Sequence, residues 1–121
     1  MSVLLQRSPP ASIKVRVAQT WLARMRGLLG YPQPAPGEGI LIPHCWSIHT
    51  IGMRYPIDVV FLDQSMVVVR ICPGVPPGRL ALWSRRATHV LELASGQASA
   101  LGICAGKTFE AWFGVSDRCA S

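Results

Sequence analysis

The sequence predicts a mainly β (α+β) fold of about seven short strands and two short helices, arranged as a compact small barrel or sandwich. Three observations favour this fold class. A chain of 121 residues suits a single domain, over residues 1–121, with one hydrophobic core. Half of the residues are hydrophobic. They occur in short runs between prolines and glycines, and runs of this length are typical of strands.

The N-terminal part is predicted to contain a tail, an outer strand and a helix. Residues 1–11 are predicted to be a flexible tail. Apolar and basic residues alternate over Ile13–Val17, which is typical of a half-buried strand. From Thr20 to Gly30 the apolar residues follow helical spacing, with Thr20 suited to the N-cap and Gly30 to the end of the helix.

The middle of the chain is predicted to contain the buried strands. Three prolines and two glycines over residues 31–39 predict a loop. Val59–Leu62 is apolar on both faces, so its strand should be central in the sheet. Asp63–Ser65 has the composition of a hairpin turn. The strands predicted in this part are Ile40–Ile42, Ser47–Thr50, Ile57–Leu62 and Met66–Ile71.

The C-terminal part is predicted to begin with a long flap. Residues 72–86 contain three prolines, two glycines and three arginines, and loops of this length are commonly functional or mobile. His89–Leu93 then predicts a strand and Gln97–Leu101 one helical turn. Lys107–Phe113 is predicted to be the last strand.

Charge and composition narrow the classes of partner. The formal net charge is +6, but the arginines are scattered from Arg7 to Arg118. A nucleic-acid partner is therefore not favoured, because its usual footprint is a clustered basic face. No apolar stretch is long enough to cross a bilayer, and the first residues do not resemble an export signal. We therefore expect a cytoplasmic, basic protein with no membrane partner and with its four cysteines reduced.

One segment, Ser47–Asp63, places ionisable side chains inside an apolar, strand-forming stretch. Asp58 opens the doubly apolar strand, and a buried carboxylate costs several kcal/mol unless it is paired or hydrogen-bonded. Its candidate partners are Arg54, His49 and the backbone N–H groups of the intervening bend. The sequence leaves open whether Asp58 supports the fold or contacts a ligand.

A second set of residues suggests where an anion could bind. Trp83 lies near Arg85 and Arg86 in the predicted flap, and an aromatic plane beside guanidinium groups suits phosphates or single-stranded bases. If the flap converges with Thr50 and Arg54, these residues would frame a polar pocket. That pocket would suit a small anionic molecule or a peptide carboxylate.

Three motifs resemble a known family when they are taken together. They are WLARMRGLLG, then SIHTIGMRYPIDVVFLD, and finally THVLELASG followed by LGICAGKTFE, in that order. In these motifs the chain is similar to the domain-of-unknown-function 192 family over almost its whole length. The resemblance implies a compact, mainly β fold and no established activity or substrate.

The favoured hypothesis is a non-enzymatic module that binds a small anionic ligand or a protein partner. The alternatives are a small hydrolase that uses His49 and Asp58 as acid/base groups, and a nucleic-acid accessory protein. Cys45 is not a suitable nucleophile for His49, because their Cα atoms lie about 13 Å apart in an extended segment. No catalytic set, metal site or cofactor is predicted. The candidate ligand-binding residues are His49, Thr50, Met53, Arg54, Asp58, Arg85 and Arg86.

Overall fold

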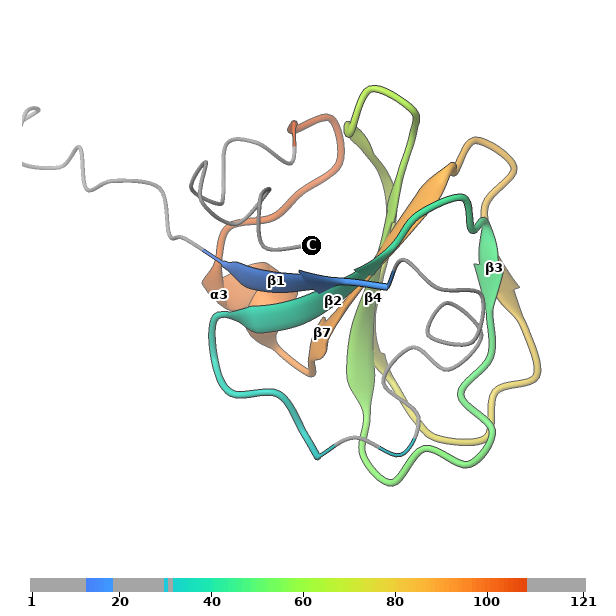
Figure 1. Cartoon of the computed structure of the whole chain (residues 1–121), viewed down its shortest axis with the longest axis vertical. Helices are drawn as coiled ribbons and strands as arrows, with labels where there is room; N and C mark the ends of the chain where they lie inside the picture. The colour runs from blue at the N-terminus through green and yellow to red at the C-terminus, as the bar shows by residue number, and fades with distance from the viewer. Residues whose placement is uncertain (1–12, 19–29, 31, 109–121) are drawn as a thin grey trace, which may run out of the picture.

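A computed structural model describes residues 13–18, 30 and 32–108 of the chain. These residues form seven strands in two sheets and one short helix (Figure 1). The mainly β fold class is thereby confirmed, although the sheets do not close into a barrel. The elements are β1 (Lys14–Val17), β2 (Glu38–Ile42), β3 (Ser47–Ile48), β4 (Ile57–Leu62), β5 (Val68–Val75), β6 (Leu82–Trp83), β7 (His89–Ala94) and α3 (Gln97–Ala100).

The larger sheet has five strands in the order β1-β2-β7-β4-β5. β1 runs parallel to β2 at one edge, and the other neighbours are antiparallel. The alternating strand Ile13–Val17 is therefore an outer strand, as predicted. β4 lies between β7 and β5, and all six of its residues are buried. This confirms the interior position that its apolar sequence predicts.

The two faces of this sheet carry separate hydrophobic cores. Odd-numbered residues of β4, such as Val59 and Phe61, belong to one core, against which Ile48 of β3 packs. Even-numbered residues, such as Val60, belong to the other core, together with Ala98 of α3. We call them the β3-side core and the α3-side core. This division decides which polar side chains of the sheet can meet.

The predicted flap over residues 72–86 is wrong in part. β5 continues through Pro73 to Val75, and β6 forms inside the same stretch. The register between β4 and β5 shifts by one residue between Ile57 and Val59, which indicates a β-bulge. Gly74 has φ +57° there. An edge strand with a bulge tolerates a proline, so the strand does not end where the sequence suggests.

Other predictions agree with the structure or fall outside it. The Asp63–Ser65 turn is confirmed, because Met66 N donates to Asp63 O over 2.9 Å. The helical turn predicted at Gln97–Leu101 is α3. The tail over residues 1–11, the helix from Thr20 and the end of the last strand lie outside the described residues, although Thr108 forms a bridge with Val67. No helix in the described part of the chain is long and apolar enough to cross a bilayer.

Candidate functional site

Residues 46–54 and 79–86 form an antiparallel unit that we call the outer ribbon. The ribbon contains β3 and β6, which pair with each other and with no strand of the larger sheet. Figure 1 shows β3 set to one side of the five-stranded sheet. Ile48 and Leu82 face inward and pack against the β3-side core. The ribbon is therefore attached to the sheet by one face and presents the other to solvent.

Cross-strand hydrogen bonds extend the ribbon beyond its two short strands. Ser84 N donates to Trp46 O over 3.1 Å at one end. Thr50 N donates to Arg79 O over 2.9 Å at the other. Thr50 is four positions after Trp46 in the sequence, so the paired part is about 13 Å long at about 3.3 Å per residue. The ends of the ribbon are thus well separated.

Thr50 holds one end of the ribbon in place. Its side chain is buried, and its Oγ1 donates to Pro76 O and accepts from Arg79 N, each over 2.8 Å. The chain then turns, with Met53 N donating to Thr50 O over 3.1 Å and Gly52 at φ +88°. Thr50 is therefore a structural residue here, because both hydrogen-bonding capacities of its hydroxyl are used within the fold.

The ribbon exposes an unusual number of large hydrophobic residues to solvent. Large hydrophobic residues are normally buried, and several exposed together mark an interaction site. Four such residues of the described chain belong to the ribbon. Their exposed fractions are 57% for Trp46, 47% for Ile51, 79% for Leu80 and 47% for Trp83.

The ribbon is also positively charged. Residues 43–57 and 76–88 contain no aspartate or glutamate. The four arginines of these segments, all exposed, are Arg54, Arg79, Arg85 and Arg86. A fifth arginine, Arg70 of β5, donates from Nη1 to the backbone oxygen of Trp83. Positive charge without compensating carboxylates favours an anionic partner.

Asp58 is placed where it supports the fold. The residue is 1% exposed. Oδ1 accepts from Gly74 N in the bulge of β5, and Oδ2 accepts from Ala98 N at the start of α3, both over 2.8 Å. Of the partners that the sequence suggests, Arg54 and His49 are not the ones observed; the partners are backbone N–H groups, but not those of the bend between Arg54 and Asp58. Asp58 instead joins two segments that lie 16 and 40 residues further along the chain.

The structure does not bring His49 and Asp58 together. His49 lies on the outer ribbon, which packs against the β3-side core, and its Nδ1 accepts from Ile51 N over 3.2 Å. Asp58 lies on the same face of β4 as Val60 and Leu62, which belong to the α3-side core, and it bonds to α3. The two side chains therefore lie on opposite faces of the five-stranded sheet. They cannot act as an acid/base pair in this arrangement.

The remaining predicted site residues separate into two groups. Met53 is buried in the β3-side core, as Thr50 is at the ribbon end. Arg54 follows the turn at the Thr50 end, whereas Arg85 and Arg86 follow Ser84 at the Trp46 end. These arginines therefore do not surround one compact pocket. They lie at opposite ends of an exposed ribbon. His49 is next to Thr50, at the end where Arg54 lies.

Sequence reasoning missed Glu92, a second buried carboxylate. Glu92 on β7 is 4% exposed and lies opposite Val59, which places it on the β3-side face. Burial and the negative charge of Glu92 raise the pKa of the nearby Tyr55 hydroxyl, which donates to Pro32 O over 3.2 Å. The signal was present in the sequence, because Glu92 interrupts the apolar strand HVLELA as Asp58 interrupts IDVVFL.

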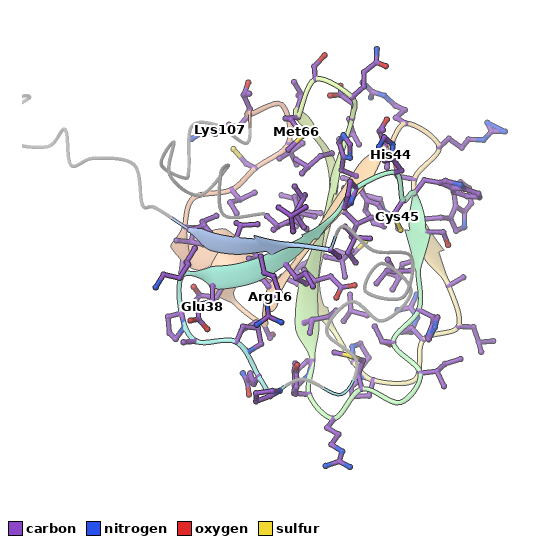
Figure 2. All side chains as sticks on the ribbon, viewed as in Figure 1. Arg16, Glu38, His44, Cys45, Met66 and Lys107 are labelled. Carbon is purple, nitrogen blue, oxygen red and sulfur yellow. The ribbon has the colours of Figure 1, made fainter. Side chains whose placement is uncertain are left out.

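A histidine pair lies where the chain enters the ribbon. Figure 2 shows His44 and Cys45 together just before β3. The rings of His44 and His89 are 5.7 Å apart, and His44 N donates to His89 Nδ1 over 3.3 Å. His44 also adopts a left-handed backbone conformation, with φ +55°. Within the described residues, no three His, Cys, Asp or Glu side chains group so as to hold a metal ion.

This pair predicts a loss of stability in mild acid. Burial and the charge of His44 lower the pKa of His89 below 6.5, although Asp63 opposes the shift. The unfolded chain therefore takes up this proton first as the pH falls. The contribution of His89 to stability is present above pH 6.5 and is lost as the pH falls below it. Denaturant melts between neutral and mildly acidic pH should show this decline in the free energy of unfolding.

His89→Asn tests the assignment, because asparagine Oδ1 can replace Nδ1 as the acceptor but does not titrate. This variant should lose less stability in acid than the wild type does. His49→Asn is the matched control, since His49 Nδ1 also accepts a backbone N–H. An equal acid loss in the wild type and His89→Asn would contradict the role of His89.

Comparisons with known proteins place the chain in a family. The profile of DUF192, described as "Uncharacterized ACR", matches residues 3–111. The chain belongs to the DUF192 family. A search of curated proteins found no match. Membership therefore accounts for the three motifs of the sequence and assigns no activity.

Two solved structures resemble this DUF192 chain. A protein of unknown function from Novosphingobium aromaticivorans has 23% sequence identity and a TM-score of 0.69, with 78% of this chain and 71% of that chain covered. A protein from Sinorhizobium meliloti, described as "a putative transcription regulator", has 25% identity and a TM-score of 0.71, with 78% of each chain covered. The likeness supports the fold described above.

Proposed function

We propose that this protein is a non-enzymatic binding module and that the outer ribbon recognises an anionic partner. One observation carries the proposal: the ribbon exposes Trp46, Ile51, Leu80 and Trp83 beside four arginines, with no acidic residue in either of its segments. Exposed aromatic residues and arginines are the side chains most enriched at the energetic centres of interfaces. A solvated surface would be expected to mix charges of both signs.

The hydrolase alternative has less support. It needs His49 within hydrogen-bonding reach of Asp58, and these side chains lie on opposite faces of the sheet. Asp58 also has both oxygens occupied by backbone N–H groups. An anionic partner needs no acid/base pair and uses residues that are exposed.

The nucleic-acid alternative rests on one specific feature, the position of Trp83 next to Arg85 and Arg86 at one end of the ribbon. Bases could stack on Trp83 while the guanidinium groups contact phosphates. The name of the Sinorhizobium meliloti protein, "a putative transcription regulator", is compatible with this alternative. We therefore include an oligonucleotide among the probes below.

The test is a thermal-shift series with phosphate, citrate, a short poly-L-glutamate and a short oligothymidylate. An anion that binds the folded protein should raise its melting temperature. We expect a rise with at least one of these probes. The rise should be lost in Arg85→Gln/Arg86→Gln, because these side chains supply the positive charge at the Trp46 end of the ribbon.

Lys14→Gln/Lys107→Gln is the matched control. Both lysines are exposed, and both lie outside the ribbon. The double lysine variant removes the same charge as the double arginine variant and should keep the wild-type rise. Equal losses in the two variants would mean general electrostatic attraction that salt screens, and would overturn the proposal.

A further inference from the structure

The outer ribbon repeats the same chemistry at its two ends. One end is marked by the hydrogen bond from Ser84 N to Trp46 O, and its exposed hydrophobic residues are Trp46 and Trp83. Arg85 and Arg86 follow Ser84 in the sequence. At the other end, Ile51 and Leu80 adjoin the Thr50–Arg79 hydrogen bond, where Arg79 supplies the charge. Each end therefore combines an apolar pair with arginine. A partner that uses the whole ribbon must present apolar and anionic groups twice.

The length of the ribbon argues against a small anion as the natural partner. The two hydrogen bonds that mark its ends are about 13 Å apart along the strand. Phosphate or citrate can reach only one end at a time. The partner should therefore be extended over several residues or nucleotides.

The aliphatic end argues against a nucleic acid. Bases bind single-strand sites by stacking on aromatic rings and guanidinium planes. Leu80 is 79% exposed and Ile51 is 47% exposed, and neither has a π-face on which a base could stack. A nucleic acid would leave this apolar pair uncovered, whereas apolar side chains of a protein would cover it.

Resting on the proposed function, we infer that the partner is a protein that lays an extended acidic segment with apolar side chains along the ribbon. Aspartate and glutamate pair with arginine through bidentate hydrogen bonds, which match the charge at both ends. In an extended segment, alternate side chains point to the same face. Such a segment can therefore direct apolar residues at the exposed hydrophobic residues of the ribbon while its carboxylates reach the neighbouring arginines.

A random peptide library displayed on phage and selected on the immobilised full-length protein tests this inference. We expect the recovered peptides to be enriched in Asp and Glu together with Leu, Ile, Phe or Trp. The most enriched peptide is then synthesised with a fluorescent label, and its affinity is measured by anisotropy.

Two variants of the protein should bind this peptide more weakly. Leu80→Ser removes the most exposed large hydrophobic side chain of the ribbon, and Arg85→Gln/Arg86→Gln removes two charges at the other end. We expect each to weaken binding about tenfold or more, as is usual for anchor residues. Lys14→Gln/Lys107→Gln should change it less than about twofold. Melting temperatures of the unliganded variants show that each remains folded.

Three results would overturn the inference: no enrichment of peptides, enrichment of basic or purely polar peptides, or an affinity that Leu80→Ser leaves unchanged. Ribbon-dependent binding of oligothymidylate or of phosphatidylserine vesicles, with no peptide recovered, would also overturn it. In that case an arginine-dependent thermal shift would show that the anion-binding function stands and that only the class of partner is wrong.

Discussion

Asp58→Ala is expected to lower the free energy of unfolding by about 2–4 kcal/mol, because it leaves two backbone N–H groups without acceptors, the buried one of Ala98 and the part-buried one of Gly74. Asp58 is 1% exposed, and its carboxylate accepts from Gly74 N and Ala98 N over 2.8 Å each. Water cannot easily replace it at the buried Ala98 amide. Denaturant melts of the variant and the wild type measure the loss.

Asp63→Ala is the matched control for Asp58→Ala. Asp63 Oδ1 also accepts from two backbone N–H groups, those of Ser65 over 2.8 Å and Val67 over 3.0 Å. Asp63 lies in a half-exposed hairpin turn, where water can take its place. We expect a loss of about 1 kcal/mol for Asp63→Ala and under about 1 kcal/mol for the exposed His49→Ala. A loss for either that equals the loss for Asp58→Ala would contradict the scaffold role of Asp58.

Gly39→Ala is expected to cost about 1–3 kcal/mol through overpacking. Gly39 on β2 lies opposite Leu93 on β7. A Cβ at residue 39 would lie 2.5 Å from Leu93 Cδ2 and 2.9 Å from the backbone oxygen of Glu92. Leu93 is fully buried, so it has little room to move. The same denaturant melts measure this loss.

A double variant shows whether the contact with Leu93 is the cause. Leu93→Val removes the δ carbons and should relieve part of the clash. Gly39→Ala/Leu93→Val should therefore lose less stability than the sum of the two single variants. Strict additivity would mean that the cost of Gly39→Ala comes from elsewhere in the strand.

The parts of the fold that the sequence predicts are those with strong local signals. The alternation over Ile13–Val17 identifies an edge strand, and the apolar run of Ile57–Leu62 identifies an interior one. The Asp63–Ser65 turn is defined by local side-chain chemistry, because Asp63 binds N–H groups two and four residues away. In each case the deciding interactions lie within the segment or follow from its burial.

The parts that the sequence does not predict depend on distant partners. Pro73 and Gly74 read as a loop, yet an edge strand accommodates them as a bulge that bonds to Asp58. β6 has only two residues, and its pairing with β3 has no local signature. A proline-rich composition alone therefore overestimates the length of the loop.

The positions of the candidate site residues also depend on distant parts of the fold. Arg85, Arg86 and Arg54 are exposed as a binding role requires, but nearness in the sequence does not place them in one pocket. Asp58 is only four residues after Arg54, yet its side chain points to the α3 side of the five-stranded sheet, whereas the ribbon lies on the β3 side. Its position in β4 decides this, because it shares a face with the residues of the α3-side core. Strand alternation could have indicated this separation, whereas the contact with Ala98 could not have been foreseen.

The most direct test of the central claim is an NMR titration of the isotope-labelled protein with a short poly-L-glutamate. If the outer ribbon recognises anionic partners, the largest amide shifts should fall within residues 46–54 and 79–86. Figure 2 shows Arg16 with Glu38 at the β1–β2 edge, away from His44 and Cys45 at the entry to the ribbon. Shifts centred on that edge, or small shifts spread evenly over the surface, would contradict the claim.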